Sequence, residues 1–393
     1  MLKSIIYRIL LLINSLIPKK RSWFLFLSSP DFSGNPKALF DYLLKEYPEF
    51  DYKWIVSDPR TSEKLKSRGI QSAQEKSFKA LLWFFLSKTI VTSTLHRAKI
   101  KTKKQIYVNL WHGLPLKVIG NMCPKHLRVK TADLKGPNCI TISNSQTTTT
   151  LLAACLNVTP ESMYISGQPR CDELFNPMDR VKLTDCLGFN ELDIAKIVIH
   201  MPTYRECLGT DKNLSNPFGF DGFDLNQWYQ FLEKNRILFI CKLHPLERIP
   251  FVKSDENKGC KHFVIFNESF LREQESDLYR LIGCSDLLVT DYSSVYFDYL
   301  LLDRSIIFTP TDLEEYKRER GFLLEPYDFW TPGPKARNQG ELQKEIIMCL
   351  DNPSYFKEER ERVADIIHVH RDKFSCQRVS EVVLNRILIS DKK

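Results

Sequence analysis

The sequence predicts an α/β protein with two Rossmann-like halves that face a cleft, each built on a parallel sheet. Two observations predict this class. Short apolar segments alternate with longer segments of helical periodicity, which is typical of parallel βαβ units. The alternation weakens in 171–193 and then resumes, and 393 residues are enough for two domains. We therefore place the domain boundary between residues 183 and 184.

The composition is that of an ordinary globular protein, with 43% apolar and 26% charged residues. A net charge of +8 suits nucleic acid, an anionic membrane or a phosphorylated substrate. The basic residues are scattered and lack an aromatic RNA-binding motif, which argues against nucleic acid. Eleven cysteines without a C-x-x-C pair favour a reducing compartment and free thiols.

Residues 1–21 have membrane character. The apolar segment Ser4–Ile17 contains Arg8 and is followed by Lys19-Lys20-Arg21. It is shorter than the roughly 20 residues of a spanning helix, and no small-residue cleavage site follows it. As a helix with a broad apolar face and basic ends, it fits the surface of an anionic membrane. The alternative is a first helix that packs on the protein's own core.

The N-terminal half, residues 22–183, alternates strands and helices. The predicted helices are Lys37–Tyr47, where Leu39 and Leu43 have helical spacing, and Phe78–Phe85. The predicted strands are Trp23–Leu27, Tyr52–Val56, Thr89–Thr92, Gln105–Trp111 and Cys139–Ser143.

The C-terminal half, residues 184–393, repeats the alternation around a predicted helix at Leu225–Lys234. The helical run Tyr355–Ile389 is expected to close this domain. The predicted strands are Ile197–His200, Ile237–Leu243, Phe263–Phe266, Leu287–Thr290 and Ser305–Phe308.

The polar turn after Leu287–Thr290 organises this half. Thr290 and Asp291 lead to Ser293 and Ser294, at or near the first turn of a predicted helix. Open α/β sheets bind ligands at the carboxyl ends of their strands, and a helix N-terminus attracts phosphate. The serines also have the residue type of helix caps. Phosphate binding and capping share one geometry, so both interpretations stay open.

Three further signatures follow predicted strands. His112 stands beside Gly113, with Lys117 nearby, and histidine is the side chain best suited to proton transfer near neutral pH. A packed structural histidine is the alternative at this position. The other two signatures offer phosphate-binding groups and consist of Thr203 with Arg205, and of Lys242 with His244.

Several common chemistries are absent from the sequence. It contains no G-x-x-x-x-G-K-[ST] loop, G-x-G-x-x-G fingerprint, G-x-S-x-G elbow or H-E-x-x-H helix. It contains no D-x-D pair and no zinc-type ligand spacing. We therefore expect neither a metal nor a cofactor.

Taken together, the four signatures resemble the CDP-glycerol glycerophosphotransferase family, the enzymes of teichoic acid and related capsule synthesis. The shared motifs are WHGLPLK, PTYR, KLHP and SDLLVTDYSSVYFDYLLLDRSIIF, followed by DLEEY, RGF and PGP. They run in the family's order from about Ser33 to Pro334. The length resembles that of single-addition, primase-type members.

The resemblance implies a GT-B fold whose N-terminal half binds the acceptor and whose C-terminal half binds a CDP-activated donor. It implies that His112 is the general base and that His244 assists at the diphosphate. Gly113 and Lys117 are acceptor-side candidates, while Glu314 and Glu315 are candidates for the ribose or a solvated helix start. The donor-side candidates are Thr203, Arg205, Lys242, Thr290, Asp291, Ser293 and Ser294. For Asp291, orienting the turn and binding a donor hydroxyl both remain open.

The expected function is transfer of glycerol phosphate or another polyol phosphate from CDP-glycerol or CDP-ribitol to a lipid-linked saccharide. This would take place at the cytoplasmic face of the cell membrane, with the protein bound peripherally. The alternatives are a GT-B glycosyltransferase that uses a nucleotide sugar and a non-catalytic nucleotide-binding subunit of an assembly complex.

Overall fold

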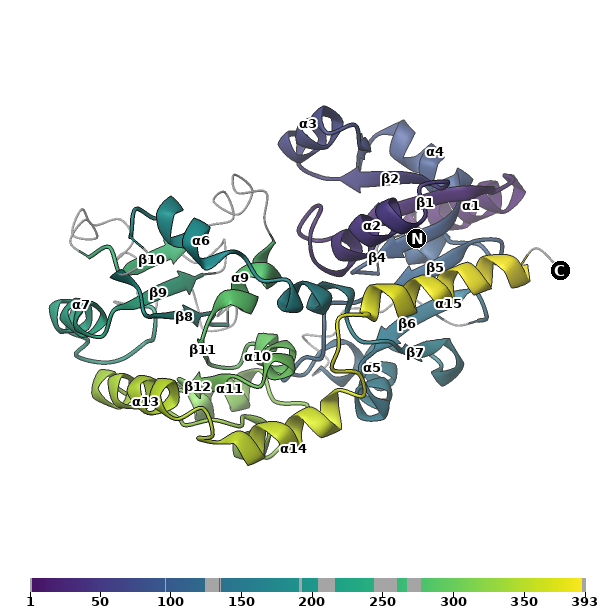
Figure 1. Cartoon of the computed structure of the whole chain (residues 1–393). Helices are drawn as coiled ribbons and strands as arrows, with labels where there is room; N and C mark the ends of the chain where they lie inside the picture. Colours follow the sequence, from purple (N-terminus) through teal and green to yellow (C-terminus); the bar gives the residue numbers. More distant parts are fainter. Residues whose placement is uncertain are drawn as a thin grey trace. The chain divides into compact units, whose positions relative to one another are not determined.

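The computed structural model describes residues 2–95, 97–123, 134, 136–190, 193–203, 216–243, 260–266 and 277–390. The chain forms two compact units, each with its own sheet (Figure 1). Unit 1 comprises Met1–Leu114, Ile119–Asp172 and His368–Lys393, and unit 2 comprises Pro115–Val118 and Glu173–Ile367.

Over its described residues, unit 1 contains a seven-stranded sheet of parallel pairs in the order β3-β2-β1-β4-β5-β6-β7. Its strands are β1 (Lys20–Leu27), β2 (Asp51–Val56), β3 (Gln71–Gln74), β4 (Ser87–Thr92), β5 (Ile106–Asn109), β6 (Cys139–Ser143) and β7 (Met163–Ile165). Its α-helices are α1 (Leu2–Leu16), α2 (Gly34–Glu46), α3 (Pro59–Ser67), α4 (Phe78–Leu86), α5 (Gln146–Leu156) and α15 (Ser375–Ser390).

Over its described residues, unit 2 contains a five-stranded sheet of parallel pairs in the order β10-β9-β8-β11-β12. Its strands are β8 (Lys196–His200), β9 (Ile237–Lys242), β10 (Phe263–Phe266), β11 (Leu287–Thr290) and β12 (Ser305–Phe308). Its α-helices are α6 (Arg180–Cys186), α7 (Leu225–Lys234), α9 (Leu278–Cys284), α10 (Val295–Tyr299), α11 (Leu313–Glu319), α12 (Tyr327–Trp330), α13 (Gln339–Asp351) and α14 (Lys357–Ile367).

The ten predicted strands are all present, and their pairing is parallel as expected. The structure adds β3 and β7, which the sequence analysis missed. β3 has the sequence QSAQ, without an apolar run, and β7 is three residues long. Both lie at the edges of the sheet, where a strand needs few buried apolar side chains.

The unit boundary differs from the predicted one at 183/184. Residues 173–183 belong to unit 2, where the backbone N–H of Met178 donates to the carbonyl of Arg280 (3.0 Å). The carbonyl of Leu174 lies 2.5 Å from the Cβ position of Gly283, so this close packing needs glycine. The predicted 171–193 link therefore contains chain that is packed onto unit 2.

The final helix, α15, belongs to unit 1 and does not close the C-terminal half as predicted. Asp172 accepts hydrogen bonds from the N–H groups of Ser375 (2.9 Å) and Cys376 (2.7 Å) at its start. α15 lies beside α2 on the unit 1 sheet (Figure 1). The apolar residues that it contributes to this core are Val379, Val383 and Ile387.

Helix α1 is fixed at its carboxyl end. The buried Asn14 side chain donates to the carbonyl of Ile100 (2.7 Å) and to Gln105 Oε1 (2.8 Å). Lys19 Nζ donates to the carbonyls of Asn14 (2.8 Å) and Phe85 (2.5 Å). Burial, with the nearby charge of Lys104, lowers the pKa of Lys19 to about 8.

Much of the described surface of α1 is apolar, although Arg8 is also exposed there. Its large exposed apolar side chains are Ile5, Ile6, Tyr7, Ile9, Leu11, Leu12, Ile13 and Leu16. Among the described residues, none of the helices has both the length and the apolar character required to cross a bilayer.

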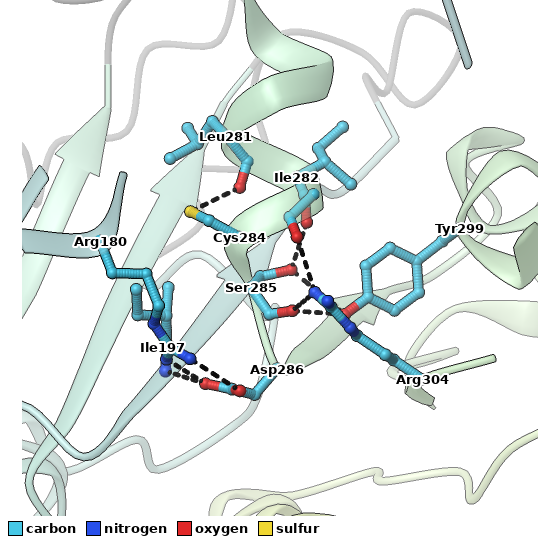
Figure 2. Close-up of polar contacts among 10 residues, drawn as sticks. Arg180, Ile197, Leu281, Ile282, Cys284, Ser285, Asp286, Tyr299 and Arg304 are labelled. Atoms are coloured by element: carbon cyan, nitrogen blue, oxygen red, sulfur yellow. Dashed lines mark hydrogen bonds and ion pairs between the residues drawn. The ribbon is translucent and has the colours of Figure 1, made fainter. Parts of the chain in front are cut away.

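The segment before β11 is held by two arginines, as Figure 2 shows. Asp286 pairs with Arg180 through two hydrogen bonds (2.5 and 3.2 Å) and accepts the N–H of Ile197 in β8 (2.7 Å). Arg304 donates to the carbonyls of Gly283 (2.7 Å) and Ser285. These contacts fix the amino end of β11 against β8 and so set the register of the strand that leads to the Asp291 turn.

We predict that Asp286→Ala lowers the free energy of unfolding by about 1–3 kcal/mol, because the N–H of Ile197 loses its acceptor. Asp286→Asn retains an acceptor oxygen and should cost about 0–1 kcal/mol, the scale of an exposed ion pair. Urea denaturation measures both variants. Arg318→Ala, at an exposed position, serves as the control. Equal losses for Asp286→Ala and Asp286→Asn would contradict the role assigned to the Ile197 contact.

Candidate active site

The polar signatures of unit 2 follow neighbouring strands. β8 lies between β9 and β11, and β12 lies on the far side of β11. Because the strands are parallel, Thr203, Lys242 and Asp291 all come at or just after the carboxyl ends of their strands. This arrangement was predicted from the sequence. Arg205 and His244 lie outside the described residues.

Asp291 joins the turns that follow β8 and β11. The residue is 2% exposed, and its Oδ1 accepts the N–H of Thr203 (2.8 Å) and the N–H of Tyr292. Thr290 Oγ1 donates to the carbonyl of Met201 (2.7 Å), which adds a second link between the two turns. Of the two roles left open for Asp291, these contacts support orientation of the turn.

Ser293 and Ser294 lie where predicted, half-buried at the start of α10. Of the two interpretations left open, capping does not hold for Ser294, whose side chain makes no capping hydrogen bond. A cap residue normally has an extended backbone, which lets its side chain reach back to the first free N–H groups. Ser294 already has α-helical angles (φ −64°, ψ −4°), so its side chain lacks that geometry.

An aromatic cluster supports the Asp291 turn. Tyr292 stacks on Tyr316 of α11, with ring centroids 4.1 Å apart, and its hydroxyl donates to Asp312 (3.0 Å). The Tyr327 hydroxyl donates to the carbonyl of Asp291 (3.1 Å). The stacking brings α11 to the turn. Its first turn carries the ribose candidates Glu314, which is exposed, and Glu315, which is half-buried.

A buried lysine, Lys242, and a half-buried one, Lys335, lie at the same edge of the sheet. Lys242, the last residue of β9, is 9% exposed, and its Nζ donates to the carbonyl of Leu243 (3.1 Å). Lys335, which the sequence analysis did not single out, pairs with Phe308 at the end of β12. Its Nζ donates to the carbonyls of Thr331 and Gly333. Burial lowers the pKa of Lys335 to about 8.

His112 follows β5 in unit 1 and is exposed. Its ring stacks on Trp111 with centroids 4.1 Å apart, and Nδ1 lies 3.4 Å from the carbonyl oxygen of Ser93. The neighbours of His112 both have positive φ, +47° for Trp111 and +102° for Gly113. The histidine therefore lies on a turn of unusual backbone conformation at a strand end, as expected of an accessible group.

The two acceptor-side candidates belong to different units. Gly113 is part of unit 1, whereas Lys117 lies in the Pro115–Val118 segment of unit 2. Lys117 is half-buried and forms an antiparallel bridge with Phe322, and the N–H of Val118 donates to the carbonyl of Gly321 (3.2 Å).

Two parallel α/β sheets with polar turns at the carboxyl ends of their strands are the architecture of the GT-B type, and the predicted fold class is confirmed. The sequence model of the CDP-Glycerol:Poly(glycerophosphate) glycerophosphotransferase family matches residues 6–385. The chain belongs to this family, which confirms the resemblance found in its motifs.

Individual relatives agree with this assignment. A teichoic acid poly(glycerol phosphate) polymerase of Bacillus spizizenii is 29% identical over 379 residues, covering 90% of this chain and 89% of the relative. A teichoic acid glycerol-phosphate transferase of Staphylococcus aureus is 27% identical and covers 86% of each chain. The solved wall teichoic acid polymerase TagF, as a histidine-to-asparagine variant soaked with CDPG, superposes with a TM-score of 0.75. It is 22% identical, and the match covers 98% of this chain and 96% of TagF.

We predict that Asp291→Ala lowers the free energy of unfolding by about 1–3 kcal/mol, because two backbone N–H groups lose their buried acceptor. Thr290→Val keeps the shape of the side chain and removes the hydrogen bond from its hydroxyl to the carbonyl of Met201. It should lower the free energy of unfolding by about 1 kcal/mol. Chemical denaturation of unit 2, followed by aromatic fluorescence, measures both variants. A larger loss in Thr290→Val than in Asp291→Ala would contradict the central role given to the carboxylate.

Proposed function

We propose that the protein transfers glycerol phosphate, or another polyol phosphate such as ribitol phosphate, from a CDP-polyol to a lipid-linked saccharide. The product would enter a teichoic acid or capsule-type polymer. Membership of the glycerophosphotransferase family over residues 6–385 is the observation that carries this proposal. The names of the two curated relatives, and the CDPG used with TagF, favour the same donor chemistry.

The proposed reaction is an in-line substitution at phosphorus. An acceptor hydroxyl attacks the β-phosphorus of the CDP-polyol, the bond to the CMP oxygen breaks, and a phosphodiester forms. Neutral His112 takes the hydroxyl proton. Such a transfer depends mainly on positioning and charge stabilisation. An exposed histidine on a strand-end turn is accessible to an acceptor, which supports this role.

Unit 2 is proposed to hold the donor. The Asp291 contact brings the backbone of the β8 and β11 turns together, and the half-buried Ser293 and Ser294 follow directly. Backbone N–H groups and the Lys242 ammonium would meet the developing charge on the diphosphate. Arg205 and His244 are proposed for the same clamp from the sequence motifs. Glu314 and Glu315 are proposed for the ribose.

The protein is proposed to act at the cytoplasmic face of the cell membrane as a peripheral protein. The exposed apolar residues of α1, together with Arg8 within the helix and the basic residues 19–21 after it, suit the interface of an anionic bilayer. A lipid-linked acceptor would lie at the same surface.

The reaction is tested with purified protein, a short-chain lipid-linked disaccharide and either CDP-glycerol or CDP-ribitol. We expect acceptor-dependent CMP release and a product heavier by one polyol phosphate, with His112→Ala lowering the rate by about 10²–10⁴-fold. If the protein turns over nucleotide sugars but neither CDP-glycerol nor CDP-ribitol, its reaction is glycosyl transfer instead. Nucleotide binding without turnover would indicate a non-catalytic subunit. Full activity in His112→Ala would exclude it as the base.

The membrane assignment is tested by co-sedimentation with phosphatidylglycerol vesicles. Leu12 and Leu16 are 63% and 74% exposed, so Leu12→Ser with Leu16→Ser should leave the fold intact. We expect binding about tenfold weaker or more, from the apolar surface lost. The matched control is Leu44→Ser with Val369→Ser, which removes exposed apolar side chains elsewhere in unit 1. Equal binding by the two double variants would exclude α1 as the anchor.

A further inference from the structure

The turn that carries His112 is clamped by side chains from distant parts of unit 1. Asn35 comes from the start of α2, and Arg170 comes from the 3-10 helix Pro169–Phe175 that follows β7. Both side chains bind backbone carbonyl groups of the residues Leu110, Trp111 and His112. None of these contacts involves the imidazole itself.

Asn35 uses both ends of its amide. It is 1% exposed, and Nδ2 donates to the carbonyls of Leu110 (3.1 Å) and Trp111 (3.1 Å) and to Gln168 Oε1 (2.5 Å). Its Oδ1 accepts the N–H of Arg170 (3.1 Å). One buried amide therefore joins the His112 turn to the segment that carries Arg170.

Arg170 completes the clamp. Its Nη2 donates to the carbonyl of His112 (2.8 Å). The same nitrogen lies 2.8 Å from the Cβ position of Gly113, where φ is +102°. The backbone angle favours glycine, and a larger residue here would also push the guanidinium aside.

The clamped backbone is also unusual. Trp111 has φ +47°, which bulky L-residues rarely adopt, and its ring forms the platform on which His112 stacks. Such a conformation persists only where the surroundings over-determine it, and it is common at functional sites. Here the surroundings are the Asn35 amide on the Trp111 carbonyl and the Arg170 guanidinium on the next one.

We propose that Arg170 and Asn35 are positioning residues for His112, acting through the backbone of its turn. This inference rests on the proposed function, in which His112 is the general base. Loss of the clamp would let the turn relax and move the imidazole away from the acceptor hydroxyl. Displacement of a reacting group by about 1 Å can cost about 10²-fold in rate.

The test compares Arg170→Ala with Arg378→Ala. Arg378 is the matched control because its Nε donates to the carbonyl of Ser166 (2.8 Å), in the same segment, and its guanidinium binds Asp372 and not the His112 turn. We expect kcat to fall by about 10²-fold in Arg170→Ala, with the KM for the CDP-polyol changed by less than about threefold. Arg378→Ala should keep its kcat and lower only the thermal stability.

Two further measurements separate positioning from general structure. Guanidinium chloride at millimolar concentration should restore part of the kcat of Arg170→Ala and have no effect on Arg378→Ala. In the His112→Ala background, adding Arg170→Ala should lower kcat by less than about threefold further. The effects of residues that act as one unit are non-additive. A full additional loss there, or an unchanged kcat in Arg170→Ala alone, would overturn the proposal.

The proposal also has a readout that does not require turnover. The His112 imidazole signal in NMR spectra, assigned by its absence in His112→Ala, should shift in Arg170→Ala and Asn35→Ala and stay in place in Arg378→Ala. If His112→Ala is fully active, the base assignment fails, and the imidazole shift still decides whether Arg170 positions the turn. An unshifted signal in both clamp variants would refute positioning even if His112 is the base.

Discussion

The arrangement of the strand-end turns in unit 2 depends on the hydrogen bonds that the buried Asp291 side chain accepts. Parallel strands place their carboxyl ends at one edge, but sheet pairing stops before the turns begin, so another interaction must hold those turns together. Asp291 accepts N–H groups from both its own turn and the turn after β8. The Tyr327 hydroxyl then fixes the Asp291 carbonyl from a third segment. The geometry of the proposed donor site follows from these bonds.

The His112 turn in unit 1 is also held by side chains from other segments, but there the side chains are hydrogen-bond donors and the backbone accepts. There the turn presents carbonyl oxygens, and the side chains of Asn35 and Arg170 donate hydrogen bonds to them. The Asn35 network extends further, because Gln168 Nε2 donates to Asn144 Oδ1 (3.0 Å) and Asn144 contacts His368 (3.5 Å). The chain re-enters unit 1 at His368. Buried polar networks of this kind rigidify the segments that they join.

Local sequence predicted the strands with apolar runs and missed the others. Five residues of Cys139–Ser143 sufficed because every one is buried, whereas β3 is polar and β7 is too short for its periodicity to show. The unit boundary was misplaced for a related reason. The packing of Gly283 on the Leu174 carbonyl, and of α15 on Asp172, joins residues far apart in the chain, which periodicity does not report.

The candidate site shows the same limit. Sequence motifs identified Asp291 and His112, because strand-end residues with useful chemistry can be read locally. The residues that hold them in place, Asn35 and Arg170, come from a helix start and from the segment after the unpredicted β7. A prediction of β7 would have placed Arg170 in the segment that follows a strand, where the other candidates were sought.

The charge of Asp291 places a constraint on any donor bound beside it. A buried carboxylate close to a diphosphate would repel it unless cations and N–H groups compensate. Asp291 Oδ1 accepts two backbone N–H groups, which stabilise its negative charge. The Lys242 ammonium at the end of β9, which donates to the carbonyl of Leu243, is one of the cations proposed to meet the donor phosphates. In the proposed site, Asp291 therefore binds backbone N–H groups and orients the turns, while cationic side chains bind the donor phosphates.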